Sequence, residues 1–181
     1  NPFIQFHISP NVKEREYLTE DELKAVMTHE FADSKLAYIR DIFIFASFTA
    51  LSFVDIQELT NDNIVEVNGE KWILSKRHKT KVAFQVKLLD IPLQIVERYR
   101  PMQKDNRIFP GLNYWSICKP LKRMIRECGI TKSISFHCSR HGFATLALSK
   151  GMPIESVSRV LGHTNIVTTQ LYAKITTQKL D

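Results

Sequence analysis

Four side chains in the last third of the sequence have the types and spacing needed to attack a phosphodiester. They are His137, Arg140, His163 and Tyr172. A guanidinium and an imidazole can neutralise the non-bridging oxygens of a phosphate, and a second imidazole can move a proton. A phenolate can act as the nucleophile and form a covalent bond to phosphorus. We therefore interpret this stretch as a candidate active site for phosphodiester cleavage without a metal.

Each of these side chains also has an ordinary structural interpretation. A single tyrosine near the end of a chain usually packs against the core, and a histidine such as His163 often caps a helix. His137 and His141 are four residues apart, as in a helical metal-binding pair, but no third ligand of clear spacing accompanies them. The order and spacing of the whole set favour the catalytic interpretation.

The composition indicates a globular domain with a basic surface. The 181 residues carry a formal net charge of +6 and a pI near 9.3. This charge favours a polyanionic partner, although a solvated basic surface is the ordinary alternative. No apolar run approaches the ~20 residues that span a bilayer, so no membrane partner is expected. Three cysteines without a close pair indicate a reducing cytosol: Cys118, Cys128 and Cys138.

The periodicity of the sequence predicts a mostly helical fold with one small antiparallel sheet. Apolar residues at helical spacing predict a long buried helix from Leu36 to Phe53. Asn68-Gly69 suits the type I′ turn of a β-hairpin, and a further strand over 82–88 gives a sheet of three strands. A capping box at Thr19 predicts an earlier helix. Other helices are expected near 54–59, 93–99, 114–128, 137–149 and 154–161, with a short one that presents Tyr172.

Two stretches of the sequence resemble the signature boxes of a known family. H-C-S-R-H-G-F-A-T resembles the H-x-x-R-H-x-F-A box of tyrosine recombinases, also called phage-type integrases. V-L-G-H-T-N-I-V-T-T-Q-L-Y resembles their L-G-H-x-x-x-x-T-T-x-x-Y box. The resemblance covers essentially the whole chain and implies the tyrosine recombinase catalytic fold for residues 1–181. Residues 1–16 are then expected to be a linker from a missing N-terminal core-binding domain, and 173–181 a C-terminal tail.

The resemblance implies a role for each matching residue. Tyr172 corresponds to the nucleophile, Arg140 to the second catalytic arginine and His137 to the residue that assists proton transfer. His163 corresponds to the position that contacts the scissile phosphate. The family also has a lysine general acid at the turn between its second and third strands, where R-H-K-T places Lys79. A solvated lysine at a hairpin tip is the alternative. Other nearby lysines are less well placed: Lys76, Lys81 and Lys87.

One position departs from the family pattern. The family's first catalytic arginine ends a T-G-L-R motif, but this chain reads T-A-L-S, so Ser52 stands at that position. Losing a charge-assisted contact to the transition state costs about 3 kcal/mol, on the order of a hundredfold in rate. Some conjugative-transposon integrases tolerate this change. Arg77 lies two residues before Lys79, so strand alternation predicts that it faces the same phosphate. Its alternative role is a contact with the DNA backbone away from the cut site, and Arg40 is a weaker candidate.

The resemblance implies a site-specific recombinase of a prokaryotic mobile element. Such an enzyme cleaves and rejoins double-stranded DNA through a 3′-phosphotyrosyl intermediate, with no cofactor, metal or ATP. The expected assembly is a homotetramer on two duplexes, with DNA-bending accessory proteins, at the nucleoid in the cytoplasm. Two other functions stay open. One is a nicking-closing enzyme similar to type IB topoisomerases, and the other is a non-catalytic DNA-binding module in which Ser52 marks lost activity.

Overall fold

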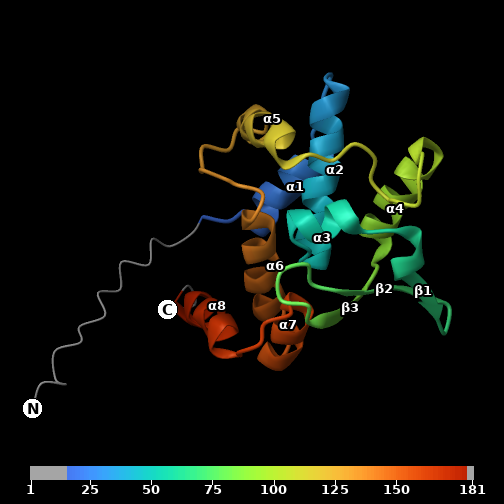
Figure 1. The fold of residues 1–181 in the computed structure, drawn as a ribbon. Coiled ribbons are helices and arrows are strands. Elements are labelled where there is room, and N and C mark those ends of the chain that lie inside the picture. Colours follow the sequence, from blue (N-terminus) through green and yellow to red (C-terminus); the bar gives the residue numbers. More distant parts are fainter. Residues whose placement is uncertain (1–15, 179–181) are drawn as a thin grey trace, which may run out of the picture.

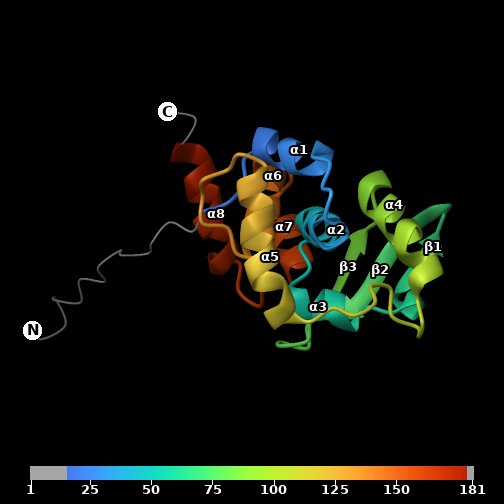
Figure 2. The same cartoon turned by 90° about the horizontal axis from the view of Figure 1, so that it is seen from above.

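A buried helix, α2 (Ser34–Thr49), lies at the centre of the computed structural model, which describes residues 16–178. Figure 2 looks down this helix and shows it surrounded by other elements. It packs against α1 (Glu20–Thr28), α4 (Asp90–Tyr99), α5 (Tyr114–Glu127) and α6 (Cys138–Ser149). Because neighbours cover it on several sides, its sequence is apolar almost all round. Residues 1–15 of the expected linker over 1–16 lie outside the described residues.

The central helix ends one turn earlier than its apolar pattern predicts. Ala50 adopts the left-handed conformation, with φ of 58°, and stops α2 after Thr49. Phe53 instead begins a separate short helix, α3 (Phe53–Glu58), which Ser52 caps by accepting a hydrogen bond from the Asp55 N–H at 3.3 Å. The prediction of one helix from 36 to 53 is therefore wrong at its end, since the chain turns sharply at Ala50.

The predicted three-stranded antiparallel sheet is confirmed. Its strands are β1 (Ile64–Val67), β2 (Glu70–Lys76) and β3 (Ala83–Lys87), in the spatial order β1-β2-β3. Asn68 and Gly69 both have positive φ, of 51° and 78°, as the type I′ turn requires. Ile73 pairs with Val86, and both side chains are buried in the core. The sheet and α4 lie to one side of α2 (Figure 1).

The C-terminal helices form a second packed group on the other side of α2. There, α7 (Ile154–Leu161) and α8 (Val167–Gln178) both contact α6. A small buried cluster of Ala50, Ala144, Val157 and Leu161 joins these helices to the end of α2, and Tyr172 packs against it. Residues 173–178 of the expected C-terminal tail over 173–181 belong to α8, and 179–181 lie outside the described residues.

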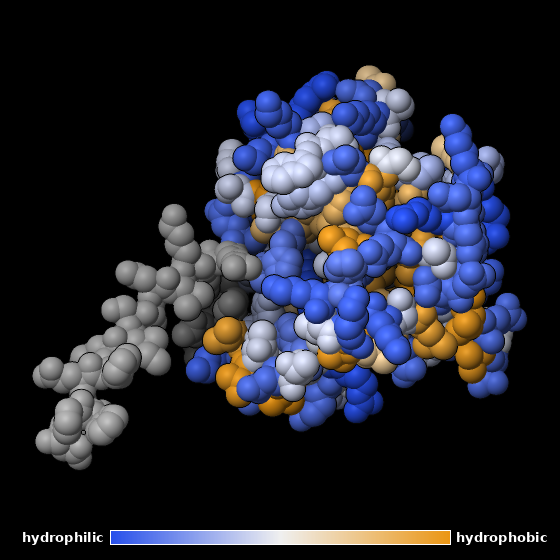
Figure 3. Space-filling view, viewed as in Figure 1, coloured by the Kyte–Doolittle hydropathy of each residue, from blue (hydrophilic) through white to orange (hydrophobic). Residues whose placement is uncertain are grey.

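Two short 3₁₀ helices complete the described elements, η1 (Asn61–Asn63) and η2 (Arg100–Met102). Hydrophilic residues predominate on the face shown in Figure 3, with exposed hydrophobic residues in smaller groups between them. Between residues 16 and 178, no helix has the length and apolar character needed to cross a membrane. The observed fold is mostly α-helical with one small sheet, as the sequence predicts.

Candidate active site

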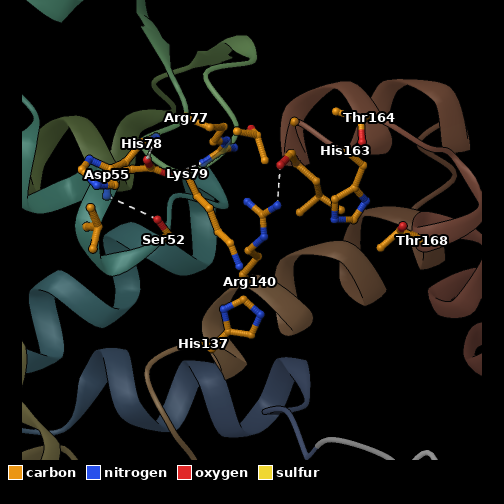
Figure 4. Close-up of a pocket in the computed structure, with 14 residues that line it drawn as sticks. Ser52, Asp55, Arg77, His78, Lys79, His137, Arg140, His163, Thr164 and Thr168 are labelled. Atoms are coloured by element: carbon orange, nitrogen blue, oxygen red, sulfur yellow. Dashed lines mark hydrogen bonds and ion pairs between the residues drawn. The ribbon is translucent and has the colours of Figure 1, made fainter.

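A cavity of about 700 Å³ opens where four segments of the chain meet. These segments are the turn from α2 to α3, the turn from β2 to β3, the start of α6 and the junction of α7 with α8 (Figure 4). The residues that line the cavity are Ser52, Val54, Asp55, Arg77, His78, Lys79, Thr80, His137, Arg140, Leu161, Gly162, His163, Thr164 and Thr168. Segments up to 116 residues apart in sequence, from Ser52 to Thr168, therefore build one site.

Six of the seven residues singled out in the sequence line this cavity. They are Ser52, Arg77, Lys79, His137, Arg140 and His163. The seventh, Tyr172, is not one of the lining residues. The three less well placed lysines do not line the cavity either. Arg40 is also excluded as a site residue, because it bonds to Asp41 at 2.9 Å and to the His29 carbonyl at 2.7 Å instead.

Two guanidinium groups converge on a single backbone carbonyl beneath the cavity. The Ala50 oxygen accepts a hydrogen bond from Arg140 Nη1 at 2.9 Å and a longer one from Arg77 Nη1 at 3.4 Å. The left-handed conformation of Ala50 ends α2 at this point. Arg140 and Arg77 also donate from Nη2 to the carbonyls of Leu161 and Val160, respectively. These carbonyls belong to the last turn of α7, whose partial negative charge favours nearby cations.

Gly162 lets Arg77 approach the end of α7 closely. It caps α7 in the left-handed conformation, with φ of 64°. A Cβ atom at this position would lie 2.9 Å from Arg77 Cγ and 3.0 Å from Arg77 Nε. On its other side, the Arg77 guanidinium carbon lies 4.1 Å from the centre of the Phe84 ring. The arginine is thus enclosed, and only 5% of its surface is exposed.

Asp55 links the turn between β2 and β3 to α3 through hydrogen bonds. Its Oδ2 accepts a hydrogen bond from Arg77 Nη1, and its Oδ1 accepts one from the His78 N–H, each at 2.9 Å. Burial alone would raise the pKa of Asp55, but the bonds from His78 and Arg77 hold this pKa below its usual value. Asp55 is therefore ionised at neutral pH and anchors the turn that carries Lys79.

The charges of the two arginines are only partly compensated within the protein. Burial lowers the pKa of Arg140 to about 10, and the positive charge of Arg77 acts in the same direction. Burial also lowers the pKa of Arg77, although Asp55 opposes this change. A bound anion would favour the charged form of both side chains. The cavity is therefore suited to a phosphate group.

His163 is neutral at physiological pH. Burial is the main cause that lowers its pKa to about 4, and the charges of Arg140 and Arg77 add to the effect. Its Nδ1 atom is hydrogen-bonded to the Thr169 hydroxyl at 2.7 Å. A neutral imidazole has one N–H donor and one acceptor nitrogen, so the other ring nitrogen of His163 offers the cavity a donor or an acceptor, according to which nitrogen carries the hydrogen.

Lys79 and His137 approach the cavity from opposite walls. Lys79 lies in the turn between β2 and β3 and extends toward Arg140 (Figure 4). The expectation that Arg77 and Lys79 share a strand face is wrong, because β2 ends at Lys76 and both residues belong to the turn. His137 precedes the first turn of α6, one turn before Arg140. An ammonium group and an imidazole are thus both available for proton transfer.

Tyr172 lies beside the cavity and is hydrogen-bonded to a residue to which the sequence reading gave no catalytic role. Its hydroxyl contacts Nδ1 of His141, a buried residue of α6. The His141 ring also lies edge-on to the ring of His137, with centroids 4.6 Å apart. Burial and Arg77 lower the pKa of Arg140, and the nearby Tyr172 phenol opposes this change. Tyr172, the candidate nucleophile, therefore directly contacts α6, the helix that carries Arg140.

Sequence reasoning missed four contributors to the site: Ala50, Asp55, His141 and Thr169. Asp55 carried a readable signal, because S-F-V-D places it three residues after Ser52, the spacing of a helix-capping pair. His141 and Thr169 stand at fixed positions of the two family boxes, which marked them without giving their roles. Ala50 acts through its backbone and had no such signal. Among residues 16–178, no group of three or more His, Cys, Asp or Glu side chains is placed to hold a metal ion.

Comparison with known proteins decides the family. The model of the phage integrase family matches residues 16–179. The chain belongs to the phage integrase family. Tyrosine recombinase XerA of Pyrococcus horikoshii is 32% identical over 177 residues, which cover 90% of this chain and 58% of XerA. The phage integrase chain thus spans little more than half the length of this relative.

Solved structures show the same fold at lower identity. The XerH site-specific recombinase in a post-cleavage complex with its palindromic difH substrate has a TM-score of 0.72 and 22% identity, covering 91% of this chain and 51% of that one. The Tn1549 transposon integrase in complex with circular intermediate DNA has a TM-score of 0.77 and 15% identity, covering 95% and 68%. This phage integrase domain therefore has the tyrosine recombinase catalytic fold.

The close approach of Gly162 to Arg77 predicts an unusually costly alanine substitution. Gly162→Ala adds the strain of a left-handed alanine, about 1–2 kcal/mol, and a Cβ that displaces Arg77. Gly151→Ala is the matched control, because Gly151 also has positive φ but no atom lies within 4 Å of its added Cβ. We expect urea unfolding to show a larger loss of unfolding free energy for Gly162→Ala. Equal losses would contradict the role of the close approach.

The low pKa of His163 predicts that this ring takes up its proton only near pH 4. Since the usual pKa is about 6.5, the unfolded chain binds this proton first as the pH falls. The contribution of His163 to stability is therefore complete above about pH 6.5 and lost as the pH falls toward 4. An NMR titration should show His163 neutral at pH 5.5, with His163→Gln used to assign its signals. A midpoint near 6.5 would refute the environment described.

Proposed function

We propose that this domain is the catalytic part of a site-specific DNA recombinase, which cleaves and rejoins strands through a covalent bond to Tyr172. The proposal rests on the cavity, where two guanidinium groups and Lys79 can surround a phosphate. The helix that bears Tyr172 lies beside this cavity. Such a set can neutralise a phosphodiester as charge develops in the transition state. Membership of the phage integrase family supports the proposal.

The proposed reaction moves a phosphoryl group from DNA to the protein and back. The Tyr172 oxygen attacks phosphorus, the bond from phosphorus to the 5′-oxygen breaks, and the Lys79 ammonium gives its proton to that oxygen. The product is a 3′-phosphotyrosyl bond and a free 5′-hydroxyl. Attack by the 5′-hydroxyl of a partner duplex then restores the phosphodiester and releases Tyr172. Bond energy is conserved in the covalent link, so ATP is not required.

Two histidines are candidates to accept the phenolic proton of Tyr172. His141 is already hydrogen-bonded to the Tyr172 hydroxyl. His137 lines the cavity, and the family resemblance assigns proton transfer to it. Because Tyr172 is not among the lining residues, its phenol has to move toward the phosphate before attack. We propose that His141 holds the phenol in the resting site and that His137 assists proton transfer at the phosphate.

We propose that Arg77 supplies the charge that the first catalytic arginine gives in the family. Ser52 and Arg77 line the same cavity, and Asp55 contacts both residues. Because Arg77 is almost fully buried, its charge acts with little screening by solvent. Arg140 is more exposed than Arg77 and donates to the same Ala50 carbonyl oxygen. In this arrangement, Arg140 contacts the phosphate and Arg77 adds positive potential behind it.

The proposed partner is double-stranded DNA at a recombination site. A net charge of +6 favours such a partner. The XerH and Tn1549 integrase structures are described as complexes with DNA. Assembly as a homotetramer on two duplexes, DNA-bending accessory proteins and a place at the nucleoid in a prokaryotic cytoplasm belong to the same proposal. The mobile-element assignment rests on the resemblance and on the structural likeness to a transposon integrase.

Trapping the covalent intermediate tests the proposed function. A pool of nicked duplexes with a randomised target segment is incubated with the chain at low salt, where phosphate contacts are strongest. Nicked substrates lose a short fragment after cleavage, so the phosphotyrosyl product should accumulate and appear as a protein–DNA adduct on a denaturing gel. Tyr172→Phe should give no adduct, whereas Tyr114→Phe, which removes an exposed phenol from α5, should behave as the wild type. DNA binding without any adduct would instead identify a non-catalytic binding module.

An exchange of residues tests the role of Arg77. Arg77→Gln should slow adduct formation by about a hundredfold, because it removes a charge next to the transition state. Ser52→Arg in the Arg77→Gln background should restore most of the rate, since the new side chain can pair with Asp55 and face the same cavity. Thermal melts establish that each variant is folded. Wild-type cleavage by Arg77→Gln, or no recovery in the folded double variant, would refute the compensation.

A further inference from the structure

A threonine on the helix of the nucleophile contacts the phosphate-facing histidine from behind. Thr169 belongs to α8, and its side chain is completely buried. Its Oγ1 lies 2.7 Å from Nδ1 of His163. His163 lines the cavity and Thr169 does not, so the bond is on the inner side of the imidazole ring. The other ring nitrogen is the one left for a ligand in the cavity.

The direction of this hydrogen bond follows from the burial of the hydroxyl. A buried hydroxyl has to donate its proton to an acceptor, since an unmade buried bond costs about 1–3 kcal/mol. The other buried threonines of the described helices donate to a carbonyl four residues earlier, Thr145 to His141 and Thr49 to Phe45. Among the described residues, Thr169 has no such bond, and Nδ1 of His163 is its one acceptor within reach. The hydroxyl therefore donates and Nδ1 accepts.

The acceptor role of Nδ1 determines the tautomer of His163. A neutral imidazole that accepts at Nδ1 carries its hydrogen on Nε2. We infer that Thr169 is a positioning residue that holds His163 as an Nε2–H donor aimed at a phosphate in the cavity. Burial and the charges of Arg140 and Arg77 lower the pKa of His163 and keep the imidazole neutral, as this tautomer requires. This inference rests on the proposed function for its role in cleavage, but not for the tautomer itself.

The placement of Thr169 also links the donor to the nucleophile. Thr169 and Tyr172 are three residues apart on α8, so they lie on one face of the helix. Thr169 contacts His163 and Tyr172 contacts His141, which places two imidazoles against that face. The orientation of the His163 donor thus depends on the same helix that delivers the attacking phenol.

The tautomer can be measured without DNA or activity. Long-range ¹H–¹⁵N correlation spectra of the chain with labelled histidine distinguish a protonated Nε2 from a protonated Nδ1. We expect the Nε2–H tautomer in the wild type and in Thr169→Ser, which keeps the hydroxyl. In Thr169→Val, which has the same shape but no hydroxyl, the Nδ1 signal should lose the shift of a hydrogen-bonded acceptor. A wild-type spectrum with hydrogen on Nδ1 would overturn the inference, whatever the outcome of the cleavage assay.

Adduct formation then tests whether Thr169 acts through His163. We expect Thr169→Val to slow the cleavage step about tenfold at saturating DNA with little change in DNA affinity, and Thr169→Ser to restore the rate. In a His163→Ala background the valine substitution should have no further effect, because its target is gone. Thr177→Val, which removes an exposed hydroxyl that donates to the Ala173 carbonyl, is the matched control on α8. Independent, multiplicative losses from Thr169→Val and His163→Ala would show that Thr169 acts by another route.

Discussion

Two guanidinium groups donate hydrogen bonds to the same backbone oxygen, that of Ala50, and the rest of the site depends on this interaction. Two like charges this close to each other, and largely out of water, require several backbone acceptors and a carboxylate to hold them. The end of α2, the last turn of α7 and Asp55 supply these groups. Since one carboxylate faces two cations, an excess of positive charge remains, and it makes the cavity receptive to a phosphate.

Local features of this structure were predictable from the sequence, whereas contacts with backbone oxygens were not. The turn at Asn68-Gly69 and the capping box at Thr19 depend on neighbouring residues, so their residue types reveal them. An alanine in the left-handed conformation is uncommon, and nothing in an apolar helical pattern marks where it ends the helix. Arg77 and Lys79 line one cavity, but the strand alternation used to predict a shared face does not apply, since a turn and not a strand carries both.

The residues of the active site that the sequence did reveal are those that belong to the two family boxes and the strand turn. The sequence did not show which of these residues contact one another, nor which partners outside the boxes they have. Asp55 pairs with an arginine 22 positions later, and His141 meets a tyrosine 31 positions later. Such contacts exist only once α3, α6 and α8 have packed around α2. Ser52 illustrates the same point: its residue type suggests a defect, whereas its surroundings include a buried arginine.

The two contacts on one face of α8 have a consequence for how the site can be switched off. If α8 were displaced from α6 and α7, the site would lose Tyr172 and the contact that orders His163 together, while both arginines kept their carbonyl partners at Ala50 and in α7. Under the proposed function, such a domain would hold a phosphate without cleaving it. The position of this one helix would then separate binding from cleavage.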